Sequence, residues 1–426
     1  VYDPVSVSKK LDIYEYLIGE RCMPRYRFDK AEIVVSFAAD FLGDWNGQSV
    51  AADYAAARKP GKSMLRPIQV ESNLSLTGSN ADKRIKLRPS EYGHALVYLT
   101  NKVAEGTGHA SSYSVGNLSA DIKSQLDGIA GELVAKAGKS LVVVGGNDND
   151  LERFAVAINM MLENGDSTID LADRVYLRQG KDEDVASALK SMSTGNVTAV
   201  ITCGVNPSYS LPGFAEAAAK VDMRVAMTDR MDETASGMNV VLPMHHFLES
   251  WGDYIPKRKY YTLAQPTISP LFDTMQMEDV LLKLAGSSVA YKDYLKDFYQ
   301  TNIQPKVPDT TWNDALQNGI LSKEETALDA FMTAAEVYSI PDLKMTIIAA
   351  LADSSVAFGK QKVGKHEIVF YQKTGIGSGN MANNPWLHEL PDPVTRISWD
   401  NYLTISAAYS LEIDFSTLPI ENFYLE

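Results

Sequence analysis

The chain has 426 residues, of which 45% are hydrophobic and 22% are charged, and these near-average values exclude a disordered or low-complexity chain. Its length fits two or three domains of about 150 residues each. The 40 basic and 54 acidic residues leave a formal charge of −14, which disfavours nucleic-acid partners because their phosphates would be repelled.

The N-terminal region predicts an α/β unit. A β-branched run at 32–38 predicts a buried strand, and a second strand is expected at 68–71. Basic and apolar residues alternate at 83–88, which is typical of a solvated strand face. A helix is expected at 90–103, and a Gly- and Ser-rich surface loop at 106–117.

The middle of the chain alternates helical and strand patterns, which indicates parallel strands covered by helices on both faces. A helix, strand and helix are expected within 119–163, with the strand at 141–144. The elements expected after them are a helix at 183–192, a strand at 197–203, a helix at 213–221, and strands at 224–227 and 239–242. We predict one doubly wound domain here.

The C-terminal third is predicted to be mainly helical from 277 to about 364. Ser322 and Glu325 form a capping-box pattern ahead of an amphipathic run to Tyr338. Strands are expected at 345–349 and 366–371. The expected division is a first α/β unit at 1–118, a central Rossmann-like domain at 119–276, a helical segment returning to α/β at 277–375, and the start of a β-rich C-terminal domain, or a tail, at 376–426.

Two glycines, Gly145 and Gly146, stand where a strand ends and a helix begins. Backbone amides at such a turn can bind a phosphate. The third spaced glycine of the dinucleotide fingerprint is absent, and the acidic residues within 147–150 would repel a pyrophosphate. Capping of the next helix is the favoured interpretation, and a nucleotide-binding dehydrogenase is kept as an alternative.

The loop at 204–207 ends a predicted strand at the carboxyl edge of the sheet, where open α/β sheets bind ligands. Asn206 is its most polar side chain. Gly, Asn and Pro are also ordinary turn residues. A purely structural loop and a pocket wall therefore both remain open.

The densest polar group contains His245, His246, Glu249 and Asp253. A His-x-x-Glu spacing can place His246 and Glu249 on one helical face, as in a metal or acid–base pair. A catalytic zinc site needs about three protein ligands, and the other histidines are scattered. The favoured interpretation is a pair of buried, hydrogen-bonded histidines.

The cysteine content excludes further metal chemistry. Cys22 and Cys203 are the only two cysteines, whereas an iron–sulfur cluster needs about four thiolates. No apolar run approaches the roughly 20 residues that cross a bilayer. We therefore assign no catalytic, no cofactor-binding and no metal-binding residue in this chain.

The order of several motifs resembles the central α/β domains of the molybdopterin oxidoreductases. They are GVNP at 204–207, TDRMDETA at 228–235, VVLP at 240–243 with Glu249 and Gly252, and NNPWLHELPDP at 383–393, followed by WDN at 399–401. The resemblance spans roughly residues 20 to 405. It implies doubly wound, mostly parallel sheets of the molybdopterin oxidoreductase type, with a mainly helical insert.

Further segments are similar to the ActB-type large iron–sulfur subunit of alternative complex III. They are YRFDKA at 26–31, DFLG at 40–43, ES at 71–72, LTGSNAD at 76–82 and HHFLESWGDY at 245–254. In that family the molybdopterin-like half has lost its cofactor, and a ferredoxin-like half carries three 4Fe–4S clusters and one 3Fe–4S cluster. The complex oxidises membrane quinol and passes electrons towards cytochrome c or a terminal oxidase.

The resemblance implies that this chain is a cofactor-free scaffold. Asp253 and the basic run Lys257, Arg258 and Lys259 replace the pterin-binding pattern of active enzymes, and bulky His245 and His246 replace small residues. The implied partners are the ferredoxin-like half, multihaem and monohaem cytochrome c subunits, quinol-binding membrane subunits and a terminal oxidase.

The implied location is the periplasmic face of the bacterial inner membrane. The cluster-bearing half, an export signal and the first part of the domain are expected to lie outside the sequence. The alternative is an active molybdenum or tungsten oxidoreductase that lacks part of its chain. In that case the segment outside the sequence would supply the metal ligand.

Overall fold

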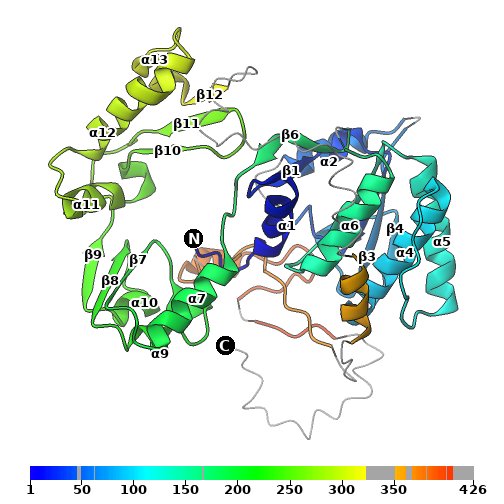
Figure 1. The fold of residues 1–426 in the computed structure, drawn as a ribbon. Helices are drawn as coiled ribbons and strands as arrows, with labels where there is room; N and C mark the ends of the chain where they lie inside the picture. Colours follow the sequence, from blue (N-terminus) through cyan, green and yellow to red (C-terminus); the bar gives the residue numbers. More distant parts are fainter. Residues whose placement is uncertain are drawn as a thin grey trace, which may run out of the picture. The chain divides into compact units, whose positions relative to one another are not determined.

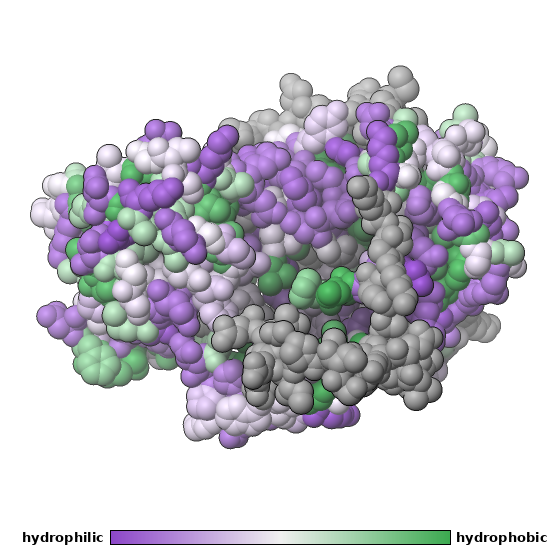
Figure 2. Space-filling model, turned by 90° about the horizontal axis from the view of Figure 1, so that it is seen from below, coloured by the Kyte–Doolittle hydropathy of each residue, from purple (hydrophilic) through white to green (hydrophobic). Residues whose placement is uncertain are grey.

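The computed structural model describes residues 1–45, 49–61, 63–165, 167–322, 351–360, 367–379, 381–399 and 401–405. The chain divides into two compact units, Val1–Val369 and Phe370–Glu426. Within the described ranges, no helix has the length and apolar character needed to cross a membrane. Figure 2 shows a face on which hydrophilic side chains are interspersed with small hydrophobic groups.

Four parallel strands form the N-terminal sheet in the order β4-β3-β2-β5, and two of them, β3 and β4, are labelled in Figure 1. Their bounds confirm the strands expected at 32–38, 68–71 and 141–144. The strand at 141–144 was expected in the central domain, but it pairs with the first strand of this sheet. The strands are β2 (Ile33–Phe37), β3 (Arg66–Glu71), β4 (Lys83–Lys86) and β5 (Ser140–Val144).

The central strand β2 and its neighbour β5 are mostly apolar and buried on both faces, whereas the edge strand β4 is partly exposed. Ile33, Val35 and Phe37 of β2 pack into one core, which also contains residues of the helices α1, α4, α5 and α6. Val34, between them, packs into a second core with α2 (Val50–Ala57). The helices of the first core are α1 (Ser8–Ile18), α4 (Tyr92–Thr107), α5 (Ala120–Ala135) and α6 (Asn149–Met161).

The central sheet is parallel and has the order β7-β8-β9. Helices α7 and α9 supply Met192 and Phe214 to a small core. The helices α7 and α9 and the three strands lie where the sequence predicted them, within a few residues, whereas the short helices α8 and α10 were not predicted. Their bounds are α7 (Asp182–Ser193), β7 (Ala199–Cys203), α8 (Pro207–Ser210), α9 (Phe214–Ala218), β8 (Met223–Thr228), α10 (Glu233–Ser236) and β9 (Val240–Pro243).

The third sheet is antiparallel, with the order β10-β11-β12. Its core is aromatic, with Tyr261, Tyr299 and Trp312 buried together. The helical prediction from 277 is correct for three helices but missed the strand that returns to this sheet. The bounds are β10 (Gly252–Tyr254), β11 (Tyr260–Ala264), α11 (Met277–Leu284), α12 (Tyr291–Phe298), α13 (Trp312–Asn318) and β12 (Ile320–Ser322).

Several predictions fall at or beyond the edge of the described residues. Glu325, the run to Tyr338, the strand at 345–349 and His366 lie outside them. Residues 367–371 form no strand, so that prediction is wrong for the described part of the segment. The described part of the second unit contains α15 (Pro385–Glu389) and turns, and no strand. The expected four-part division of the chain stays a prediction.

A short antiparallel pair, β1 (Met23–Tyr26) with β6 (Ile169–Val175), was missed by the sequence analysis. Asp173 of β6 accepts a hydrogen bond from Arg25 at 2.9 Å and pairs with Lys257 at 2.5 Å. Burial alone would raise the pKa of Asp173, but these two cations outweigh it and lower the pKa.

Asp173→Asn is expected to reduce the free energy of unfolding at pH 7 by about 1 kcal/mol. A carboxylate whose pKa is lowered by folding stabilises the fold above its unfolded pKa of about 4 and loses this effect as the pH falls through the folded pKa. The wild-type and variant stabilities should therefore converge in acid. Urea denaturation at neutral and acidic pH measures this, and a constant difference would contradict the ion-pair explanation.

Candidate functional site

The N-terminal sheet has one topological switch point. After β2 the chain runs outward to β3 and β4, and then returns to place β5 on the other side of β2. Open α/β sheets bind ligands in the crevice outside the carboxyl ends of such a strand pair. Here the crevice would lie between the loop after β2, which begins at Ala38, and the loop after β5, which begins at Gly145.

Backbone contacts hold the loop after β2 against the loop after β5. The Gly145 N–H donates to the Phe37 carbonyl at 2.8 Å. A Cβ on Gly145 would lie 2.1 Å from the Ala38 carbonyl oxygen. Only glycine fits at this position, because the approaching atom belongs to the backbone and cannot rotate away. The sequence singled out Gly145 as a phosphate-binding candidate, but its role in the structure is close packing.

A buried lysine covers the end of β5. Lys10 comes from α1, donates to the Val144 carbonyl at 3.0 Å and pairs with Glu152 of α6 at 3.2 Å. Both side chains are more than nine-tenths buried. The ammonium group also lies 4.6 Å from the centre of the Trp45 ring, where cation–π attraction adds to the pairing. The cation at the crevice is therefore already neutralised by the chain itself.

The loop after Gly146 caps α6 and makes a hydrogen bond to α1. Asp148 accepts hydrogen bonds from the N–H groups of Asp150 and Leu151 at 2.8 and 3.1 Å, which confirms the predicted helix cap. Asn147 accepts from the Lys9 N–H and donates to Asp182, both at 2.7 Å. These contacts use the groups that could otherwise hold an anion at this helix end.

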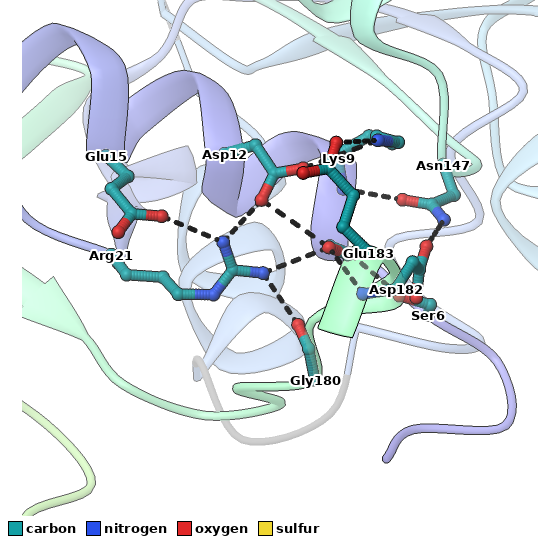
Figure 3. Close-up of polar contacts among 10 residues, drawn as sticks. Ser6, Lys9, Asp12, Glu15, Arg21, Asn147, Gly180, Asp182 and Glu183 are labelled. Atoms are coloured by element: carbon teal, nitrogen blue, oxygen red, sulfur yellow. Dashed lines mark hydrogen bonds and ion pairs between the residues drawn. The ribbon is translucent and has the colours of Figure 1, made fainter. Parts of the chain in front are cut away.

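Figure 3 shows how the start of α1 is held beside this loop. The Arg21 guanidinium pairs with Asp12 at 2.5 Å and with Glu15 at 3.1 Å. It also donates to the Ser8 hydroxyl and to the Gly180 carbonyl, at 3.0 and 2.6 Å. This network ties α1, which carries Lys10, to the segment before α7.

Two carboxylates occupy the rest of the carboxyl edge. Asp40 accepts from the Thr77 N–H and hydroxyl at 2.8 and 2.7 Å. Glu71 is buried, and it accepts from Arg84 at 2.6 Å and from the Ser75 hydroxyl at 2.5 Å. The charge of Glu71 is paired with Arg84, so Asp40 is the carboxylate that would repel a polyanion at this edge.

The polar groups of the loop after β7, in the central sheet, are also hydrogen-bonded within the chain. The Asn206 side-chain oxygen accepts from the Thr234 N–H and hydroxyl at 3.1 and 2.7 Å, and its amide donates to Glu233 at 2.6 Å. Asp232 accepts from the Ala235 N–H at 2.8 Å and caps α10. The two motifs noted in the sequence, 204–207 and 228–235, therefore meet and bind each other, which favours the structural interpretation of Asn206.

The hydrogen bonds of Glu249 come from backbone N–H groups rather than from the histidine rings. The Glu249 carboxylate accepts from the backbone N–H groups of His246 and Leu271, both at 3.0 Å, and these bonds lower its pKa. The His245 ring bonds the Thr274 hydroxyl at 2.5 Å, and the His246 ring contacts the Phe247 ring in a tilted arrangement, with 4.2 Å between the ring centres. The prediction of buried histidines is wrong, because His245 is half-buried and His246 is exposed. The His246 ring therefore plugs no cavity.

Asp253 belongs to the third sheet and does not join the histidines. It accepts hydrogen bonds from the Tyr261 and Tyr291 hydroxyls at 2.9 and 3.1 Å. Burial and the nearby carboxylate raise the pKa of both phenols, so the tyrosines remain protonated donors. Within the described ranges, no three His, Cys, Asp or Glu side chains are grouped so as to hold a metal ion.

The two thiols are expected to differ in reactivity. Burial raises the pKa of Cys22 to about 12, so its thiolate is scarce at pH 8, whereas Cys203 is only half-buried. Ellman's reagent should modify Cys203 in the native chain and reach Cys22 only after denaturation. Cys203→Ser should abolish the native reaction; a native reaction that survives this substitution would contradict the assignment.

Sequence reasoning missed the residues that fill the crevice. Lys10, Trp45 and Glu152 are far apart in the chain, and none of them belongs to a recognised motif. A lysine within an apolar helix face was the one available signal, because α1 buries Leu11, Tyr14 and Leu17 on the same element. Only the fold reveals that these side chains meet at the switch point.

No known protein-family model matches the chain. A curated relative, the menaquinone reductase molybdopterin-binding-like subunit of Nitratidesulfovibrio vulgaris, is 27% identical over 317 residues, which are 63% of this chain and 45% of that protein. The chain thus spans about half the length of this relative. Among solved structures, acetylene hydratase from Pelobacter acetylenicus aligns with a TM-score of 0.53 at 11% identity, covering 82% of this chain and 60% of that chain.

The structural alignment agrees with the mixed α/β architecture and its parallel sheets. The relative found by sequence is named as a molybdopterin-binding-like subunit. The chain therefore has the α/β fold of the molybdopterin oxidoreductase type, and 63% of it is similar in sequence to a protein named as a molybdopterin-binding-like subunit.

Proposed function

We propose that the chain is a cofactor-free structural part of an ActB-type iron–sulfur subunit in a membrane-bound, quinol-oxidising respiratory complex. The observation that carries this proposal is the filled switch point of the N-terminal sheet. Gly145 packs against the Ala38 backbone, and Lys10 pairs with Glu152 over the end of β5. A ligand crevice of the usual kind is thereby replaced by the chain's own packing.

Electrostatics support the same proposal. A molybdopterin dinucleotide carries several phosphate charges, whereas Asp40 places a carboxylate at the sheet edge and the cation of Arg84 is already paired with Glu71. The N–H groups at the start of α6 are bound by Asp148. Because these residues do not fit the cofactor, no chemical step through molybdenum or tungsten is derived for this chain.

The respiratory role draws on the relative, which is named as a subunit of a menaquinone reductase. In our proposal the clusters lie in a ferredoxin-like part of the same subunit, and electrons pass through haem subunits towards cytochrome c or a terminal oxidase. Quinol-binding membrane subunits complete the assembly at the periplasmic face of the inner membrane. The chain contributes binding surfaces, and we propose that its four parts at 1–118, 119–276, 277–375 and 376–426 act as one scaffold.

Metal and pterin analysis of the intact complex tests the absence of a cofactor. Molybdenum and tungsten are quantified by mass spectrometry, and oxidised pterin by fluorescence, with an active molybdoenzyme prepared in parallel as the positive control. We expect neither metal nor pterin in stoichiometric amount. One metal and one pterin per chain would establish the alternative, an active molybdenum or tungsten oxidoreductase.

Asn206→Ala provides a second test in the assembled complex. The substitution removes hydrogen bonds to Thr234 and Glu233, so we expect a loss of stability of about 1–2 kcal/mol. Quinol oxidation per assembled complex should be unchanged, because in a scaffold Asn206 touches no substrate. Ser236→Ala, which removes a bond to the Asp232 carbonyl, is the matched control. A selective fall in turnover for Asn206→Ala would contradict the scaffold role.

A further inference from the structure

Five large apolar side chains are exposed on two adjoining loops of the first unit. The first loop contains the short 3-10 helix η3 (Phe247–Glu249), and the second runs through residues 265–276. Phe247, Leu271 and Phe272 are 75%, 70% and 78% exposed. Ordered monomer surfaces rarely hold such a group without a use. We call the docking patch the set Phe247, Leu248, Ile268, Leu271 and Phe272.

Hydrogen bonds fix the two loops against each other. The Leu248 carbonyl accepts from the N–H groups of Thr267 and Ile268 at 2.7 and 3.2 Å. The Glu249 carboxylate bridges the N–H groups of His246 and Leu271. The Met275 N–H donates to the Pro243 carbonyl at 3.1 Å. The patch is therefore presented on a rigid backbone, which lowers the entropy lost on binding.

An exposed carboxylate borders the patch. Asp273 directly follows Phe272 and is exposed. Asp229, paired with Arg230 at the end of β8, lies close enough to His246 to interact electrostatically. The whole chain carries a formal charge of −14. A partner that buries the patch would gain from apolar side chains at its centre and basic side chains at its rim.

We propose that the docking patch binds another protein subunit of the complex, one that presents an apolar centre with a basic rim. The inference rests on the subunit role in the proposed function. It also explains the motif at 245–254, because Glu249 acts as a positioning residue that holds the apolar side chains in place. Aromatic residues on rigid loops are frequent sources of binding energy at protein interfaces.

Photo-crosslinking in the intact complex tests the location of the partner. A benzoyl-phenylalanine is introduced in place of Phe272, the complex is purified from native membranes and irradiated, and the joined peptides are sequenced. We expect one other subunit, joined at a segment rich in apolar and basic residues. A cross-link only to a second copy of this chain, only to lipid, or to no partner while the chain stays in the complex would overturn the proposal.

Substitutions test the contribution of the patch. Phe247→Ser with Phe272→Ser should reduce the retention of the chain in the complex about tenfold or more, since aromatic interface residues commonly contribute that much each. Tyr16→Ser, which removes an equally exposed aromatic ring from α1, should leave retention unchanged. Unchanged retention of the double variant would overturn the inference.

Two further variants test separately the loop geometry that presents the patch and the charge at its edge. Glu249→Gln should weaken retention less than the double variant does, because it loosens the patch without removing it. Asp273→Lys should weaken retention most at low salt if the rim of the partner is basic; no effect at low salt would overturn the charge assignment. Failure of the proposed function is distinguishable, because the unaltered chain would then purify without any other subunit.

Discussion

Lys10→Met is expected to lower the free energy of unfolding by about 3–5 kcal/mol, which is the usual cost of leaving one charge of a buried ion pair without its partner. The remaining charge would be Glu152, which is more than nine-tenths buried. The buried Tyr26 hydroxyl donates a hydrogen bond to Glu152, but at 3.5 Å this neutral donor is too weak to replace the ammonium group. Urea denaturation of the purified chain measures the change.

The double variant Lys10→Met with Glu152→Leu should recover most of this loss, because apolar side chains of similar volume can replace a buried pair at little net cost. Lys9→Met is the matched control. Lys9 neighbours Lys10 in sequence, but its pair with Glu183 at 3.3 Å lies at the surface, and such pairs contribute about 0.5 kcal/mol. Equal effects of Lys9→Met and Lys10→Met would refute the buried pair.

Gly145→Ala is expected to destabilise the N-terminal sheet by about 3 kcal/mol, because overpacking against a backbone atom forces the main chain to move. The added methyl group would lie 2.1 Å from the Ala38 carbonyl oxygen. Movement of the loop after β5 would also disturb the Lys10 contact with Val144. The midpoint of urea denaturation should shift accordingly.

Gly146→Ala provides the comparison from the next position. Its Cβ would meet no atom within 4 Å, and the φ angle of +78° is the only obstacle. The expected cost is about 1 kcal/mol, the penalty of a left-handed conformation. If Gly146→Ala lowered the stability more than Gly145→Ala, the interpretation that packing closes the switch point would be wrong. A ligand-binding turn at these two glycines would then regain support.

Local patterns were sufficient to predict most strands of the two parallel sheets. The runs at 32–38 and 141–144 are continuous and apolar because both faces of the strands are buried, and burial on two faces leaves a clear signal in sequence. The cap of α6 was also predictable, since Asp148 binds N–H groups two and three residues away. The order of the motifs led to the molybdopterin oxidoreductase type of fold, with which the structural alignment agrees.

Sheet membership was not predictable in the same way. The strand at 141–144 was assigned to the central domain because it follows a helix in chain order, yet it pairs with β2, more than a hundred residues earlier. The pairing partner of a strand depends on which apolar faces meet in space. A run of valines predicts a buried strand but does not indicate which strand lies beside it. The same holds for β1 and β6, whose short strands show no clear alternation.

The amino-acid sequence by itself determined the chemistry that is available to this protein: an acidic surface, two isolated thiols, capped helices and strands buried on both faces. Only the tertiary structure decided how the candidate residues are used, because it brought Lys10 to Glu152, Asn206 to Thr234 and Glu249 to Leu271. Each of these contacts joins segments that are distant in the chain. Their strength comes from burial and geometry, which local sequence does not encode.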